Sequence, residues 1–130
     1  MDEELRNHTR FKVKRQAFVG LIGPKSDIIF QLGQIMDISY GGVGLYYIPS
    51  ENGSDVVSHI SIFGRADTLI IIEKISCKVV YDMNVPTKGW SNLPEIRCGI
   101  EFLKPSSTQK KQIESFIRDF GINPHAEQIH

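Results

Sequence analysis

Two arginines spaced four residues apart, Arg6 and Arg10, lie in the most basic segment of the chain. Residues 1–15 hold five of the fifteen basic residues but only three of the fifteen acidic ones. Each guanidinium presents a planar fork of donors that matches the oxygen atoms of an anion. This segment is therefore predicted to be an anion-binding arm. The alternative is a solvated terminal tail, because chain ends are often poorly ordered.

A second polar cluster occupies the segment Asp37-Ile38-Ser39-Tyr40-Gly41-Gly42. Asp37 and Ser39 are two residues apart, so in an extended segment their side chains point to the same face. Gly42 allows the backbone to turn sharply or a ligand to approach it closely. The alternative is structural, since Asp and Ser before a Gly-Gly pair often cap a turn through hydrogen bonds to the backbone. The residues of this segment alone leave both interpretations open.

The elements that must position these clusters are predicted to be mostly short β-strands. Apolar or alternating runs are separated by clusters of Gly, Pro, Asn, Asp and Ser, which are typical of turns. The predicted strands are Gln16–Leu21, Ile28–Ile38, Val43–Ile48, Val56–Phe63, and two alternating runs within residues 74–81 and 95–102. Several short strands of this kind are typical of a small barrel or sandwich.

The last two strands show the clearest alternation, which predicts one face on the core and one in water. The core-facing residues are predicted to be Ile75, Cys77, Val79, Tyr81, Ile96, Cys98, Ile100 and Phe102. Both cysteines belong to this apolar set. They are therefore predicted to be buried structural side chains, in preference to a redox pair or metal ligands.

The end of the chain changes to helical periodicity. Ser106 and Gln109 match a capping box, and apolar residues then recur at helical spacing. A helix is predicted over Ser107–Phe120 with Gly121 as its C-cap. The residues thus predict an all-β fold, a small barrel or sandwich, with one C-terminal α-helix whose apolar stripe covers the strands; the alternative is a helix that binds a partner. The expected organisation is an arm at residues 1–13, the barrel and helix at 14–121, and a tail at 122–130.

Composition limits the function classes. A chain of 130 residues with 41% hydrophobic and 23% charged residues is expected to form one globular domain. Its formal net charge of zero argues against the broad basic field that nucleic-acid binding needs. The apolar run Leu69–Ile72 is too short to span a bilayer, and no signal peptide is apparent, so a cytoplasmic protein is expected. The residues show no catalytic or metal-ligand spacing, so neither an enzyme nor a metal site is predicted.

The two polar clusters, taken in order, resemble the PilZ domain family. Arg6 to Arg10 matches its RxxxR arm, and Asp37–Gly42 matches its (D/N)xSxxG motif about 30 residues later. The segment Arg97–Phe102 is similar to the late Gly-Ile-x-Phe strand of the family, and a terminal helix follows it. The resemblance covers residues 6–120. It implies an all-β, split-barrel-like PilZ fold: a six- to seven-stranded antiparallel β-barrel with one C-terminal α-helix. It also implies binding of cyclic di-GMP, a bacterial second messenger.

The resemblance assigns the ligand contacts to Arg6, Arg10, Asp37, Ser39 and Gly42. Cyclic di-GMP carries two phosphates and two guanines, and an arginine fork matches both phosphate oxygens and the O6/N7 edge of guanine. A carboxylate such as that of Asp37 can accept hydrogen bonds from the guanine N1 and N2 donors, and Ser39 offers a hydroxyl beside it.

Further contacts are expected at Leu5, Arg15, Gly41 and Arg97. In the family, a basic residue just before the RxxxR arm accompanies the binding of a stacked ligand pair. Leu5 occupies that position here, which favours one ligand per site unless Arg15 supplies the missing charge. Arg97 is placed on the polar side of its predicted strand.

The implied function is that of a cyclic di-GMP receptor whose arm changes conformation on binding and signals to an unidentified downstream protein. The outputs usual in the family are motility, exopolysaccharide synthesis and biofilm formation. One alternative is a PilZ-fold adaptor that binds a protein and no nucleotide; degenerate members of the family usually lack one motif, whereas both are intact here. Another alternative is a small barrel that binds single-stranded nucleic acid, with Tyr40, Tyr46 and Tyr47 as stacking residues.

Overall fold

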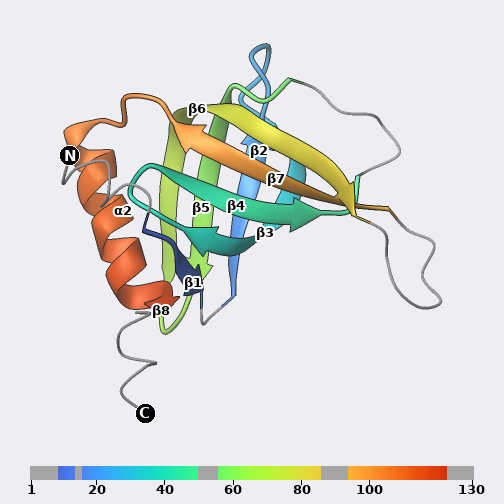
Figure 1. Cartoon of the computed structure of the whole chain (residues 1–130). Helices are drawn as coiled ribbons and strands as arrows, with labels where there is room; N and C mark the ends of the chain where they lie inside the picture. The colour runs from blue at the N-terminus through green and yellow to red at the C-terminus, as the bar shows by residue number, and fades with distance from the viewer. Residues whose placement is uncertain (1–8, 14–15, 50–55, 86–93, 123–130) are drawn as a thin grey trace.

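The computed structural model of the chain describes residues 9–13, 16–49, 56–85 and 94–122. In these residues the backbone is mostly strand, and the one helix follows the last long strand (Figure 1). The elements in chain order are β1 (Phe11–Val13), β2 (Ala17–Ile22), β3 (Ile29–Ile38), β4 (Gly42–Tyr47), β5 (His59–Arg65), β6 (Leu69–Val85), β7 (Glu95–Phe102), α2 (Ser107–Phe120) and β8 (Gly121–Ile122).

Six of the strands close into an antiparallel barrel. They are hydrogen-bonded in the order β2-β5-β6-β7-β4-β3, and β2 also pairs with β3, which closes the ring. The short strand β1 pairs with β3 outside this ring, and β8 pairs with β1. The predicted six- to seven-stranded antiparallel barrel with one C-terminal helix is therefore confirmed.

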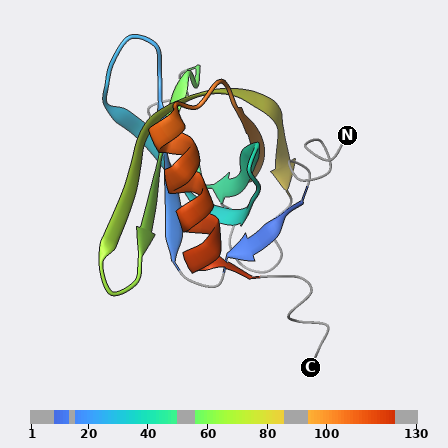
Figure 2. The same ribbon diagram turned by 90° about the vertical axis from the view of Figure 1, so that its left-hand side faces the viewer.

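Helix α2 lies across one end of the barrel (Figure 2). Its buried side chains are Ile113, Phe116, Ile117 and Phe120, and the rings of Phe116 and Phe120 stack with centroids 4.5 Å apart. Gly64 on β5 permits the helix to pack closely against the barrel, because a Cβ atom at Gly64 would lie 2.6 Å from Phe116 Cε2. The helix begins at the predicted capping box of Ser106 and Gln109, with Gln109 N donating to Ser106 Oγ over 3.0 Å.

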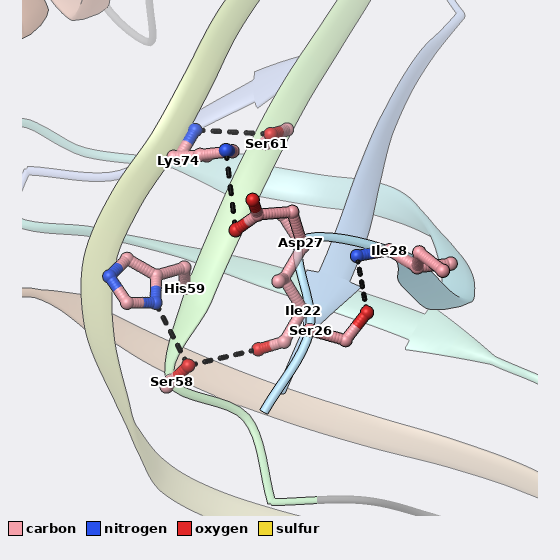
Figure 3. A network of polar contacts seen from close by, with 8 residues as sticks. All are labelled: Ile22, Ser26, Asp27, Ile28, Ser58, His59, Ser61 and Lys74. Carbon is pink, nitrogen blue, oxygen red and sulfur yellow. Dashed lines mark hydrogen bonds and ion pairs between the residues drawn. The ribbon is translucent and has the colours of Figure 1, made fainter. Parts of the chain in front are cut away.

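The longest strand, β6, bends at Lys74 and so follows the curve of the barrel. The backbone of Lys74 has a φ of 49°, and its N–H donates to Ser61 Oγ over 3.1 Å (Figure 3). Gln109 Nε2 donates to the carbonyl oxygens of Glu73 and Lys74, at 2.9 and 3.3 Å. The same glutamine that caps the helix thus satisfies the carbonyls that the bend releases from the strand ladder.

Both cysteines are buried, as predicted, with Cys77 and Cys98 only 5% and 2% exposed. The prediction that Val79 and Tyr81 face the core is wrong, since they are 37% and 47% exposed. For Tyr81 the cause is a shift in register between β6 and β7: Val79 pairs with Ile100 and Tyr81 with Gly99, which leaves Val80 as an extra residue. A β-bulge of this kind breaks the alternation of side chains beyond it.

Two short strands lie at the predicted boundaries of the arm and the tail. Phe11–Val13, assigned to the arm, form β1, and Ile122, assigned to the tail, belongs to β8. These strands hold three and two residues, which is too few for a period-two pattern. They form because β3 extends beyond its pairing with β2 and so can pair with β1, which in turn pairs with β8.

Candidate functional site

A pocket of about 430 Å³ lies beside Arg10, where β4, β7 and β6 run next to each other. It brings together parts of the chain that are far apart in sequence. The residues that line it are Arg10, Ser39, Gly41, Gly42, Val80, Tyr81, Gly99, Ile100, Glu101 and Phe102. Four of the predicted ligand contacts, Arg10, Ser39, Gly41 and Gly42, are therefore among its walls.

Asp37 joins this site through an ion pair with Arg10. Arg10 Nη1 lies 3.1 Å from Asp37 Oδ1, and the two side chains are 46% and 36% exposed. Strand pairing explains the contact, because β1 runs antiparallel to β3 with Lys12 opposite Asp37. The short strand β1 thus places the arginine that precedes it against the carboxylate on β3.

Ser39 holds the turn that connects β3 to β4. Its backbone N–H donates to the carbonyl oxygen of Gly42 over 2.8 Å, and its Oγ accepts from the N–H of Gly41 over 3.2 Å. The side chain is only 1% exposed. Ser39 therefore has the turn-capping role that formed the structural alternative for this motif, whereas the carboxylate of Asp37 faces Arg10.

Two glycines of β4 lie where there is no space for a side chain, Gly42 next to the backbone of β7 and Gly44 next to the carboxylate of Asp37. Gly42 lies opposite Glu101 on β7, and a Cβ atom at Gly42 would lie 2.2 Å from the carbonyl oxygen of Ile100. Gly44 lies opposite Gly99, and a Cβ atom at Gly44 would lie 2.6 Å from Asp37 Oδ1. A side chain at Gly42 would therefore collide with β7, and one at Gly44 would collide with the Asp37 carboxylate.

Two further charged residues at or near the pocket, Glu101 and Arg97, lie close to oppositely charged neighbours. Glu101 Oε1, in the pocket wall, lies 4.0 Å from Lys78 Nζ. Arg97, expected as a further contact, is exposed and lies outside the residues that line the pocket; its Nε is 3.8 Å from Glu95 Oε2. The lining combines the Arg10 cation, backbone groups of the turn and an apolar side from β6 and β7, which suits an anion that also carries flat rings.

The three tyrosines considered for nucleic-acid stacking are each engaged with the fold. Tyr40 packs edge-on against Phe11, and Tyr46 Oη donates to Gln34 Oε1 over 2.8 Å. Tyr47 is half-buried, and burial, with smaller effects of Cys98 and Asp82, raises the pKa of its hydroxyl. They do not form one exposed aromatic strip.

Leu5, Arg6 and Arg15 lie outside the described residues, so the arm motif is placed through Arg10 alone. Sequence reasoning missed Val80, Tyr81 and Glu101 as pocket residues. The alternation of β6 pointed Tyr81 inward, and only the pairing of β6 with β7 shows the bulge that brings it to the pocket.

Among the residues described, no group of three or more His, Cys, Asp or Glu side chains could hold a metal ion. In that same part of the chain, no helix is long and apolar enough to cross a membrane.

Comparison with known proteins defines the family. The family model for the PilZ domain matches residues 4–119, and none of the curated proteins matches this chain. A solved PilZ domain with c-di-GMP, of YcgR from Escherichia coli, superposes with a TM-score of 0.58 at 13% identity, covering 85% of this chain and 87% of that one. MrkH, described as a c-di-GMP-dependent transcription regulatory factor, superposes with a TM-score of 0.58 at 15% identity. The superposition covers 85% of this chain and 48% of MrkH, so this chain spans about half the length of MrkH.

At these identities the two structures show the shared fold. Because the family model includes both motifs and nearly the whole barrel, the chain belongs to the PilZ domain family.

Proposed function

We propose that this PilZ domain is a receptor for cyclic di-GMP and that binding repositions its N-terminal arm to signal to a partner protein. The observation that carries the proposal is the meeting of the two motifs. Arg10 from the arm and the Ser39–Gly42 turn line one pocket, and Asp37 is ion-paired to Arg10 at its edge. The bound c-di-GMP of the YcgR structure supports the same ligand here.

The chemistry of the pocket suits both parts of this ligand. Arg10 can donate two parallel hydrogen bonds to phosphate oxygens or to the O6/N7 edge of a guanine. Asp37, an acceptor-only group when ionised, can take the guanine N1 and N2 donors. Gly41 and Gly42 let the base approach the backbone, while Ser39 keeps their turn in shape. Arg6 is proposed as the second arginine of the arm, by its place in the motif.

The residue after Arg10 offers a route for the signal. The ring of Phe11 meets Tyr40 edge-on, with centroids 6.4 Å apart and an angle of 88° between the rings. Phe11 and Tyr40 also line a pocket of about 510 Å³ with Ile117 and Arg118 from α2. A ligand that redirects Arg10 would therefore shift Phe11 against the last turn of α2. In this transition the arm becomes ordered and closes over the barrel when the ligand binds.

Isothermal titration calorimetry tests the ligand. The chain is titrated with cyclic di-GMP, and cyclic di-AMP and GTP serve as controls for the base and for the cyclic backbone. We expect binding of cyclic di-GMP alone, with a stoichiometry that decides between one ligand and a stacked pair. If no heat is observed at tens of micromolar protein, the receptor proposal is wrong.

Limited proteolysis tests the arm. Cleavage before Phe11 should slow when cyclic di-GMP is present, because the bound arm is less accessible. Equal rates with and without ligand would exclude the conformational part of the proposal while leaving the binding part intact.

The second candidate is an adaptor that binds a protein and no nucleotide. It is favoured by the ion pair itself, since Arg10 and Asp37 each have an oppositely charged partner within the chain. The calorimetric experiment separates the two candidates, because the adaptor gives no heat with any of the three nucleotides.

A further inference from the structure

We infer that Tyr81 is the base-stacking residue of this pocket and helps to select a ligand that carries a purine. This inference rests on the proposed function, since it names a residue that holds the ligand of the same site. Tyr81 belongs to neither motif and lies on β6, three strands away from Asp37 in the barrel order.

The bulge in β6 brings Tyr81 to the pocket. Val80 is the extra residue between the pairs Val79–Ile100 and Tyr81–Gly99. Both Val80 and Tyr81 line the pocket, with exposures of 60% and 47%. Tyr81 is therefore a partly exposed aromatic residue in the pocket wall, against which a flat partner can pack.

The ring of Tyr81 packs against the backbone of Gly99. A Cβ atom at Gly99 would lie 2.2 Å from Tyr81 Cε1, so the ring occupies the space that a side chain would fill. In the β-sheet, Gly99 lies opposite Gly44, which in turn lies opposite Asp37. One transverse row therefore runs Tyr81, Gly99, Gly44, Asp37 over four adjacent strands, with the Tyr81 ring over Gly99 and the Asp37 carboxylate over Gly44.

This row gives the pocket two chemically different ends. At one end Asp37 and Arg10 offer an acceptor and a cation for the edge of a guanine or for a phosphate. At the other end Tyr81 and Val80 offer apolar surface. A ligand with bases on a dianionic ring has groups for both ends, and base–aromatic stacking is the interaction that an exposed tyrosine at such a position provides.

The test is calorimetric titration of cyclic di-GMP into the native chain and four variants. Tyr81→Phe keeps the ring and should bind within about twofold of the native chain. Tyr81→Leu and Tyr81→Ala remove the aromatic face and should weaken binding about tenfold or more, as for the loss of one base–aromatic stack. Tyr46→Ala is the matched control, because Tyr46 is a half-buried β4 tyrosine that does not line the pocket; it should bind like the native chain.

A spectroscopic measurement on the native chain covers the case in which a variant fails to fold. The ring protons of Tyr81, assigned by comparison with Tyr81→Phe, should shift in the NMR spectrum when a guanine stacks on them, while those of Tyr46 stay in place. If Tyr81→Leu binds as tightly as the native chain, or if the Tyr81 ring signals do not move on binding, the inference is wrong and the receptor proposal stands. If the native chain binds no cyclic di-GMP, both fail.

Discussion

Arg10 Nη1 lies 3.1 Å from Asp37 Oδ1, although 27 residues separate the two in the sequence. This ion pair joins the arm motif to the turn motif. A dianion that binds Arg10 therefore meets a guanidinium that also has a carboxylate partner. The arginine should therefore matter for binding and much less for folding.

We predict that Arg10→Ala lowers the affinity for cyclic di-GMP at least tenfold while the melting temperature hardly changes. The ion-paired side chains are 46% and 36% exposed, and a solvent-exposed ion pair contributes roughly 0–1 kcal/mol to stability. Calorimetry and thermal unfolding measure the two effects. Arg65→Ala is the control, since Arg65 is an exposed arginine of β5 outside the pocket. A large loss of melting temperature with unchanged affinity would assign Arg10 a structural role.

Ser39 is predicted to contribute more to the stability of the fold than to the binding of the ligand. Ser39→Ala removes the hydroxyl that accepts from Gly41 N and leaves a buried turn without its cap. The free energy of unfolding should fall by about 1–3 kcal/mol, as for other buried hydrogen-bonding groups. Urea denaturation measures it, with Ser107→Ala at an exposed helix position as the control, expected to change it by less than about 0.5 kcal/mol. Equal stability of the two variants would contradict the capping role.

Substitutions of Gly42 on β4 and Gly99 on the neighbouring strand β7 should have different effects, the first on stability and the second on ligand binding. A Cβ atom at Gly42 meets the backbone carbonyl of Ile100, so Gly42→Ala must push β4 and β7 apart and should lower the melting temperature by several degrees. A Cβ atom at Gly99 meets only the side chain of Tyr81, which can turn away into solvent. Gly99→Ala should therefore weaken ligand binding with the smaller loss of stability. Thermal unfolding and calorimetry on both variants check this order, and the reverse order would overturn it.

The two thiols are predicted to be unreactive while the barrel is folded. Burial raises the pKa of Cys77 to about 12, and burial together with the charge of Asp82 raises the pKa of Cys98 to about 11. Because the thiolate is the reactive form, a thiol reagent such as DTNB at pH 8 should label the native chain very slowly and the urea-unfolded chain completely. Rapid labelling of the native chain would mean that this end of the barrel opens readily.

The same pKa shifts set a direction for stability against pH. Above pH 9 the thiols of the unfolded chain lose protons, whereas Cys77 and Cys98 in the folded chain keep theirs up to pH 11–12. The unfolded state then binds fewer protons than the folded state, so the free energy of unfolding should decrease as pH rises through this range. Urea midpoints at pH 7.5 and pH 10.5 measure the decrease, which should be smaller in a Cys77→Ala/Cys98→Ala variant. An equal decrease in that variant would show that other groups cause it.

Local patterns were sufficient to predict the main elements and the family. Alternation predicted the core faces of β7, and the capping box of Ser106 and Gln109 predicted the start of α2. These signals can be read from a sequence because each depends on residues within a few positions of one another. The two motifs were found for the same reason, since each occupies five or six consecutive residues.

Contacts between distant strands decided the rest. The bulge at Val80 depends on how β6 pairs with β7, and it turned Tyr81 out of the predicted core and into the pocket. The pairing of β1 with β3 brought Arg10 to Asp37, although β1 is too short to show a pattern of its own. Residue types and spacing therefore predicted the two motifs and the family to which they belong. Strand register and backbone contact decided where those groups lie, because these depend on pairing between segments that the chain brings together only when the barrel closes.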